Sequence, residues 1–178
     1  MVSFFDLLKN RRSFRKYEPR EVEPDKILKI TKAALMSPAS KRSNPWEFIV
    51  IQDRNTLLKL SESRPYGSQM LKEAPLAIVV IADTTKSDVW IEDASIAAII
   101  IQLQAQDLGL GSCWVQVYNR QKNEQTTTEE YIKALLNIPT HFGVLCIMSI
   151  GYPDEKRKPF EEEKLADDKI HFENFKIK

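Results

Sequence analysis

The amino-acid sequence predicts a single domain in which helices alternate with the strands of one sheet. The chain has 178 residues, of which 43% are apolar, and this is enough to form one hydrophobic core. Segments with apolar residues at helical spacing alternate with short, almost continuous apolar runs that are typical of buried strands. No repeat, low-complexity tract or linker divides the chain into two domains. Taken alone, this alternation favours a parallel sheet.

Capping residues and prolines mark the elements of the first half. Ser3-Phe4-Phe5-Asp6 resembles a capping box with Asp in place of Glu, and it starts a short helix. A second helix starts at Pro24-Asp25 and ends before Pro38, because proline disfavours helical backbone in the residue that precedes it. Three further elements follow: a strand at Glu47–Gln52, a helix at Thr56–Ser63 and a strongly apolar strand at Leu76–Ala82. We expect the last of these to lie at the centre of the sheet.

The second half contains the longest predicted helix, from about residue 88 to residue 108. Its middle, Ile96–Ile101, is apolar on nearly all sides, which indicates contact on more than one side. Gly109 ends this helix. Three elements then follow: a strand at Ser112–Val117, a helix at Thr128–Leu136 and a strand at Val144–Ile150.

Residues 151–178 are predicted to form a polar C-terminal arm. The arm carries Phe160, Phe172 and Phe175, which must either stay in solvent or pack against another surface. Together with the apolar helix, these side chains suggest a partner subunit. A helix buried in its own core, followed by a frayed chain end, explains the same residues equally well.

Charge and hydropathy exclude several classes of protein. The chain has 26 Lys and Arg against 25 Asp and Glu, so its net charge of +1 differs from the basic excess of a nucleic-acid binder. No apolar run approaches the roughly 18 residues of a membrane span, and the N-terminus lacks the features of a secretory signal. Cys113 and Cys146 lie in apolar surroundings and are expected to be reduced thiols. We therefore expect a cytoplasmic protein without membrane or nucleic-acid partners.

The sequence lacks the usual motifs for catalysis by side chains or metal ions, so any chemistry is expected to come from a cofactor. His141 and His171 are the only histidines, and neither has a Cys or carboxylate at the spacing of a zinc site. No nucleophile-elbow motif or Walker loop occurs. Gly109-Leu110-Gly111 follows a helix and precedes a strand, which is the reverse of a dinucleotide-binding turn. We therefore predict no metal site and no catalytic dyad of side chains.

Three segments offer contacts for such a cofactor. Residues 11–17 contain four cations, and the planar fork of arginine suits phosphate oxygens, with Ser13 adding a hydroxyl donor. Residues 37–48 form a polar loop stiffened by two prolines, and residues 109–116 let the backbone pass close to a flat ligand. Each segment alone has a simpler interpretation: a solvated charge cluster, a helix-to-strand connection, and a helix C-cap followed by a buried strand.

Taken together and in this order, the segments resemble the nitroreductase family of flavin-dependent oxidoreductases. Five motifs carry the resemblance: Arg11–Arg15, Pro38–Phe48, Trp90–Asp93, Gly109–Trp114 and Gly151-Tyr152-Pro153. The resemblance implies an α+β fold, a three-layer sandwich whose central mixed, largely antiparallel sheet is flanked by helices. It also implies one domain over residues 1–178 and a homodimer with FMN in a groove between the subunits.

The resemblance also assigns expected roles to residues. The FMN phosphate and ribityl chain would be held by Arg11, Arg12, Ser13 and Arg15. Arg157 would be a further phosphate contact, with Lys156 or Lys158 as alternates. Pro38, Ala39, Ser40 and Arg42 would reach the same flavin from the other subunit. Trp114, Val115 and Gln116 would lie against the isoalloxazine, with a backbone N–H approaching N5. We interpret Glu92 and Asp93 as stabilisers of a helix N-terminus.

The expected activity is transfer of a hydride from NAD(P)H through flavin N5 to a nitroaromatic, quinone or similar conjugated acceptor. Three positions depart from the residues usual in the family: Ala39 stands in place of Ser, Arg42 in place of Asn and Asn44 in place of Gln. Arg42 adds a cation that suits an anionic substrate, a nicotinamide phosphate or FMN itself. Flavin fragmentation, reductive dehalogenation and a non-catalytic flavin sensor remain as alternatives. A purely structural or nucleic-acid-binding module would leave the three segments unexplained.

Overall fold

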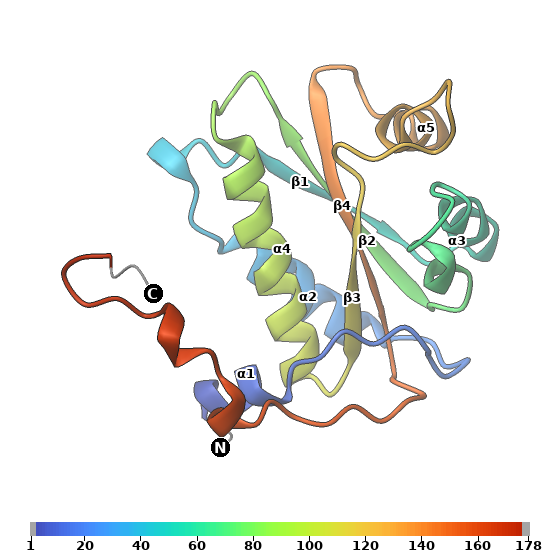
Figure 1. The fold of residues 1–178 in the computed structure, drawn as a ribbon. Helices are drawn as coiled ribbons and strands as arrows, with labels where there is room; N and C mark the ends of the chain where they lie inside the picture. Colours follow the sequence, from blue (N-terminus) through green and yellow to red (C-terminus); the bar gives the residue numbers. More distant parts are fainter. Residues whose placement is uncertain (1–2, 176–178) are drawn as a thin grey trace.

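A four-stranded antiparallel sheet forms the middle layer of the protein (Figure 1). The computed structural model describes residues 3–175. The strands are β1 (Trp46–Ile51), β2 (Leu76–Asp83), β3 (Gly111–Gln116) and β4 (Phe142–Gly151). Their order across the sheet is β1-β2-β4-β3, and each neighbouring pair is antiparallel.

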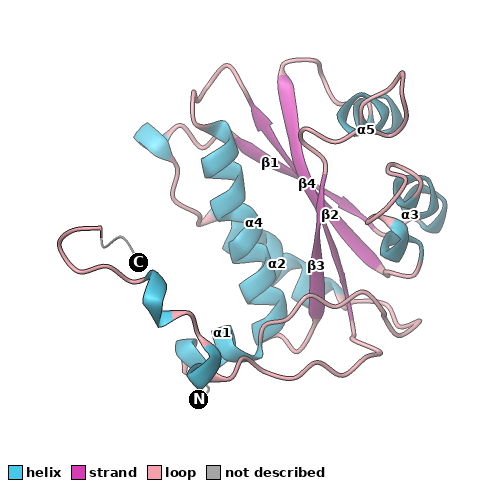
Figure 2. Cartoon of the chain, in the orientation of Figure 1, coloured by secondary structure: helices cyan, strands magenta, loops and turns pink. Residues whose placement is uncertain are grey.

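Helices cover both faces of this sheet, as Figure 2 shows. The five α-helices are α1 (Phe4–Asn10), α2 (Pro24–Leu35), α3 (Arg54–Ser61), α4 (Trp90–Asp107) and α5 (Thr128–Leu136). One core cluster joins α2 and α4 to one face of the sheet, and a second cluster joins α3 and α5 to the other face. The predicted three-layer α+β sandwich is therefore confirmed. Among residues 3–175, no helix is both long and apolar enough to cross a membrane.

The parallel sheet suggested by the alternation of helices and strands was wrong. Strands β2 and β3 do run in the same direction on either side of α4, but β4 lies between them and is antiparallel to both. Strands β1 and β2 are antiparallel neighbours. Between them in the sequence, α3 and the short turn η2 (Gln69–Lys72) pack against each other, so β2 begins beside the end of β1. The local pattern predicts the type of each element, but it does not show that β4, which comes last in the sequence, lies between β2 and β3.

Strand β2 is central, as predicted, and every residue of β2 and β4 is buried. The predicted elements agree with the structure to within two residues at most ends. Helix α3 begins at Arg54 rather than Thr56, because the Asp53 side chain accepts a hydrogen bond from the Thr56 N–H at 2.8 Å and caps the helix. Helix α4 ends at a left-handed Gly109 with φ of 75°.

The solvent-facing side of α4 is apolar. Ile96 and Ile99 are 37% and 39% exposed, although they lie in the middle of the longest helix. Leu35 and Met36, at the end of the neighbouring helix α2, are also exposed. Helices α2 and α4 therefore carry large apolar side chains that the described part of the chain leaves exposed.

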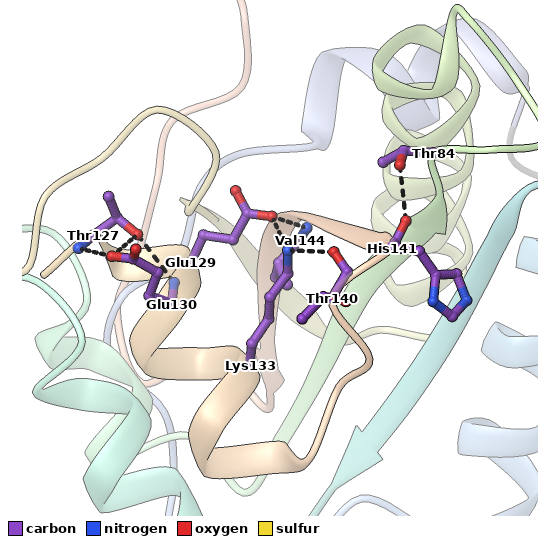
Figure 3. A network of polar contacts seen from close by, with 8 residues as sticks. All are labelled: Thr84, Thr127, Glu129, Glu130, Lys133, Thr140, His141 and Val144. Carbon is purple, nitrogen blue, oxygen red and sulfur yellow. Dashed lines mark hydrogen bonds and ion pairs between the residues drawn. The ribbon is translucent and has the colours of Figure 1, made fainter.

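A polar network ties α5 to the start of β4 (Figure 3). The Glu129 carboxylate accepts the Val144 N–H at 3.2 Å and pairs with Lys133 at 2.8 Å. Lys133 also donates to the Thr140 carbonyl, and the Thr84 hydroxyl donates to the backbone carbonyl of His141 at 2.8 Å. His141 takes part through its backbone carbonyl and not through its imidazole, so this network stabilises the fold.

Thr127 caps α5 in this network, and we expect Thr127→Ala to lower the free energy of unfolding by about 1 kcal/mol. Its hydroxyl accepts the Glu130 N–H at 3.0 Å, and Glu130 accepts the Thr127 N–H at 2.8 Å, so one substitution breaks a reciprocal pair. Urea unfolding monitored by far-ultraviolet circular dichroism measures the loss. Thr126→Ala is the matched control, because the hydrogen bonds of Thr126 in the described structure use its backbone; equal losses in both variants would contradict the assignment.

Candidate functional site

A cationic cavity lies where the N-terminal segment meets the C-terminal arm. Its volume is about 290 Å³. Five polar or charged residues line it, and all were predicted from the sequence as cofactor ligands: Arg11, Arg12, Ser13, Arg15 and Arg157. Phe160 completes the lining, while Lys156 and Lys158, the alternatives to Arg157, do not take part. Four guanidinium groups around one cavity are suited to a phosphate group.

The N-terminal segment is held in place by the first residues of β3. The Phe14 N–H donates to the Ser112 carbonyl at 3.0 Å, and Ser13 forms an isolated parallel bridge with Ser112. Phe14 is buried against Gly111, where a Cβ atom would come within 2.9 Å of its ring. A side chain at position 111 would therefore push the arginine segment out of place.

The arm is held in the cavity by Glu155. This carboxylate accepts the Arg15 N–H at 2.6 Å and pairs with the Arg157 guanidinium at 2.6 Å. Burial opposes ionisation of Glu155, but the Arg15 N–H and Arg157 outweigh it, so its pKa lies below the ordinary value. Arg12 stacks 4.2 Å above the Phe160 ring, which fixes its guanidinium as well.

The base of the arm is fastened to the segment before α2 by Tyr152. Its hydroxyl donates to Glu23 at 2.6 Å and accepts from Lys26 at 2.7 Å, and the Arg20 guanidinium lies 3.9 Å above its ring. The Tyr152 hydrogen bond is the main reason that the pKa of Glu23 falls from 4.5 to about 2. The same hydroxyl raises the pKa of Lys26.

We expect this clamp to make stability depend on pH in the acid range. Because the folded protein favours ionised Glu23, its contribution is complete above the unfolded pKa of 4.5 and disappears as the pH falls toward about 2. Wild type should therefore lose more stability than Glu23→Gln between pH 4.5 and pH 2. Urea unfolding at a series of pH values tests this, and parallel pH profiles for the two proteins would refute it.

Strand β3 presents the second group of predicted residues. It is an edge strand, so one side of its backbone lies free of a neighbouring strand beyond the bridge at Ser112. Val115 is buried in the core, whereas Trp114 and Gln116 are half-buried and bonded to each other, indole N–H to amide oxygen, at 2.8 Å. The Gln116 amide also donates to the Tyr118 carbonyl at 2.9 Å. Trp114 and Gln116 therefore lie on the same face of β3 and hold each other in place.

The third group lies on the loop before β1. Pro38 and Ala39 lead into the short turn η1 (Ser40–Arg42). Three buried polar atoms in the surrounding chain have no hydrogen-bond partner among the described residues: Ser37 Oγ, Ser43 Oγ and Trp46 Nε1. Buried polar groups are usually paired in folded proteins, so these three atoms are available to a further hydrogen-bond partner.

In one chain, this loop and the cationic cavity lie at opposite ends of α4 (Figure 1). Ser40 is bonded to Asp93 near the start of the helix, while Ser13 pairs with Ser112 just beyond its end. Eighteen residues at about 1.5 Å each separate the two ends by roughly 27 Å. One chain therefore brings the arginines, Arg157 and β3 together and leaves residues 38–42 apart from them.

The contacts of three residues of the site were not predicted from the sequence. Glu155 holds Arg157, Asp93 holds Ser40, and Arg64 donates to the Gln116 carbonyl at 3.1 Å, which brings a cation to the end of β3. Burial, followed by the nearby Arg120, lowers the pKa of Arg64. Each acts through contacts between distant segments, which no local spacing indicates.

Other features of the described chain lie outside this site. An open cavity of about 710 Å³ runs between Tyr17, Arg20 and Arg54, and none of the predicted cofactor residues lines it. Cys113 and Cys146 are both free and buried, and burial raises the pKa of each thiol. Within residues 3–175, no group of three or more His, Cys, Asp or Glu side chains could hold a metal ion.

Comparison with known proteins gives consistent matches along the chain. Residues 8–64 and 55–152 match the sequence model of the family described as "Nitroreductase family". A solved structure described as an FMN-dependent nitroreductase from Clostridium difficile is 53% identical, with a TM-score of 0.96, and the match covers 97% of this chain and 100% of that chain.

Two curated relatives give the same result. A protein of Archaeoglobus fulgidus named "Putative NADH dehydrogenase/NAD(P)H nitroreductase" is 38% identical over 98% of this chain and 100% of its own length. A protein of Methanothermobacter thermautotrophicus with the same name is 38% identical over 98% of this chain and 88% of its own length. The matched region includes the arginine segment, the loop before β1 and strand β3.

Proposed function

The chain belongs to the nitroreductase family and is an FMN-dependent NAD(P)H oxidoreductase, and we propose that its electrons pass to a nitroaromatic, quinone or similar conjugated acceptor. The observation that carries this proposal is the single cavity lined by four arginines and Ser13 beside the free edge of β3. The donor set fits the phosphate of FMN, because several guanidinium groups and a hydroxyl converge on one small space. Bound FMN would supply the two-electron chemistry that these side chains lack.

The chain's own residues would bind and orient this cofactor. The phosphate would be held by the guanidinium groups of Arg11, Arg12, Arg15 and Arg157 and by the Ser13 hydroxyl. Trp114, Val115 and Gln116 would support the ring system along the edge of β3, where backbone groups lie free of a neighbouring strand. Arg64 would place a further positive charge beside the ring.

A second copy of the chain would complete the site. We propose that Pro38, Ala39, Ser40 and Arg42 contact the flavin that is held by the arginines of the partner, because the two groups lie at opposite ends of α4 in one chain. The exposed Ile96 and Ile99 give this homodimer an apolar surface along the same helix. The unpaired polar atoms around Ser37, Ser43 and Trp46 would then face the partner's ligand.

Anaerobic titration of the purified protein tests the proposal. A bound flavin absorbs near 450 nm, and this band should bleach on addition of NADH or NADPH and return on addition of a nitroaromatic or a quinone. A flavin that neither nicotinamide bleaches would support a non-catalytic flavin binder instead. Product analysis separates the remaining chemistries, because fragmentation consumes the flavin and dehalogenation releases halide from a halogenated aromatic substrate.

A further inference from the structure

We propose that Asp93 is a positioning residue, which acts through the backbone of Ser40 to hold residues 38–44 in the shape that receives the flavin. This inference rests on the proposed function, because it concerns the loop that would reach the partner's cofactor. It adds a second role to that of a helix stabiliser, which was the interpretation of the sequence alone.

The contacts of Asp93 point away from its own helix. The side chain is 3% exposed, and one carboxylate oxygen accepts the Ser40 N–H at 2.8 Å. The other oxygen accepts the Ser87 hydroxyl at 2.7 Å. Asp93 lies four residues after Val89, the N-cap of α4, and its own N–H already bonds to the Val89 carbonyl at 3.1 Å. Its carboxylate therefore joins the loop before β1, through Ser40, to the start of α4, through Ser87, whose hydroxyl also accepts the Val89 N–H at 3.3 Å.

Burial of the Asp93 carboxylate costs free energy, which its hydrogen bonds must offset. Transfer of a charged group out of water is costly, and charge-assisted hydrogen bonds offset that cost only when both oxygens are paired. Asp93 meets this condition through Ser40 and Ser87, and its place in the first turn of α4 adds a favourable interaction with the helix dipole. The result is a fixed acceptor aimed at one backbone N–H of the loop.

The loop that Asp93 holds has a backbone that is unfavourable for its residues. Lys41, Arg42 and Asn44 have φ values of 53°, 57° and 43°, all in the left-handed region that glycine tolerates best. Such a conformation persists only where the surroundings impose it, and it is concentrated at sites that bind ligands. The ion pair of Lys41 with Asp88, at 3.6 Å, joins two exposed side chains and adds little restraint. Asp93 provides the buried restraint.

The same loop is shaped but not yet satisfied. Ser37 Oγ and Ser43 Oγ flank the turn, and both are buried without a hydrogen-bond partner among the described residues. Two of the five such side-chain atoms among the described residues flank this one turn, beside the left-handed residues that follow Ser40. We therefore interpret the Asp93–Ser40 bond as preorganisation of the loop for a ligand, which reduces the ordering cost of binding.

A pair of substitutions at Ser40 isolates this bond. Ser40→Pro removes the N–H that Asp93 accepts, and Ala39 already has the extended backbone (φ −137°, ψ 151°) that proline requires of the residue before it. Ser40→Ala removes the same hydroxyl but keeps the N–H, so it is the matched control. We expect the FMN dissociation constant of Ser40→Pro to exceed that of Ser40→Ala by at least about tenfold, or about 1.4 kcal/mol.

A second pair tests Asp93 itself. Asp93→Asn keeps an oxygen that can accept the Ser40 N–H and should retain most of the affinity for FMN, whereas Asp93→Ala should lose it as Ser40→Pro does. Glu92→Ala, at the exposed neighbouring position, should bind FMN as wild type does. Thermal unfolding of the flavin-free proteins is measured in parallel, because a positioning role weakens FMN binding in Ser40→Pro without an equal loss of stability.

The outcomes distinguish this inference from the proposed function. Equal FMN affinities for Ser40→Pro and Ser40→Ala, in a wild-type protein that binds FMN and is reduced by NAD(P)H, would overturn the role of Asp93 and leave the proposed function intact. Loss of FMN affinity in Asp93→Asn as complete as in Asp93→Ala would also overturn it. A wild-type protein that binds no FMN would overturn both.

Discussion

Replacing Arg11 or Arg15 by alanine is expected to weaken FMN binding by about 10- to 150-fold. Each arginine would lose a charge-assisted hydrogen bond to phosphate, which contributes about 1.5–3 kcal/mol. The two side chains lie at the surface of the cavity, half-buried and exposed respectively, so the free energy of unfolding should change by less than about 0.5 kcal/mol. Fluorescence titration of the flavin-free protein with FMN measures the affinity, and urea unfolding measures the stability.

Lys16→Ala is the matched control for the arginine variants. Lys16 is an exposed cation next to Arg15 in the sequence, but it does not line the cavity. Its removal should therefore leave the FMN affinity within about twofold of wild type at moderate ionic strength, where distant surface charges are screened. An arginine variant that purifies with a full complement of FMN would show that the phosphate lies elsewhere.

Placing a charge on the exposed side of α4 is expected to separate the subunits and to weaken FMN binding at the same time. Ile99→Glu is tolerable in a single chain, because the side chain is 39% exposed and glutamate is a good helix former. In a homodimer that covers this surface, the carboxylate would be desolvated without a partner, at a cost of several kcal/mol. A two-fold interface would contain the substitution twice, so the dimer should dissociate by at least about 100-fold more readily.

Analytical ultracentrifugation and FMN titration on the same samples test this prediction. The matched control is Leu58→Glu, which alters an apolar residue that is 49% exposed on α3, on the opposite face of the sheet. It should leave both the mass and the FMN affinity unchanged. A dimeric Ile99→Glu protein, or a monomeric one that still binds FMN as wild type does, would contradict the proposed subunit arrangement.

The sequence was sufficient to predict the elements, and for physical reasons that act locally. Pro24, Gly109 and the Thr127 capping box set helix ends through contacts within a few residues, and the apolar runs of β2 and β4 needed burial on both faces. Those two strands pair across sequence separations from 59 residues (Asp83 with Phe142) to 74 residues (Leu76 with Ile150), and local periodicity does not indicate such a pairing. The resemblance to a family provided the antiparallel arrangement that the pattern did not.

The site was predictable to a similar degree. Arg11, Arg12 and Arg15 were identified because a cluster of guanidinium groups is itself a chemical signal for phosphate, whereas Arg157 was identified only through the family resemblance. Glu155 was not identified, because it is one of 25 acidic residues and only its contacts with Arg15 and Arg157 distinguish it. Asp93 was singled out by its motif, but its contact with Ser40 joins distant segments and was not predicted.

The position of β4 between β2 and β3 has a consequence for how the protein is made. When the last residue of β2 has been synthesised, more than half of the chain is still to follow, and the neighbour that covers one edge of β2 begins only at Phe142. Until then, eight consecutive residues that are buried in the finished protein, Leu76–Asp83, lack that neighbour. Closing so long a loop is slow, and nascent chains at this stage would be targets for chaperones that bind extended apolar segments.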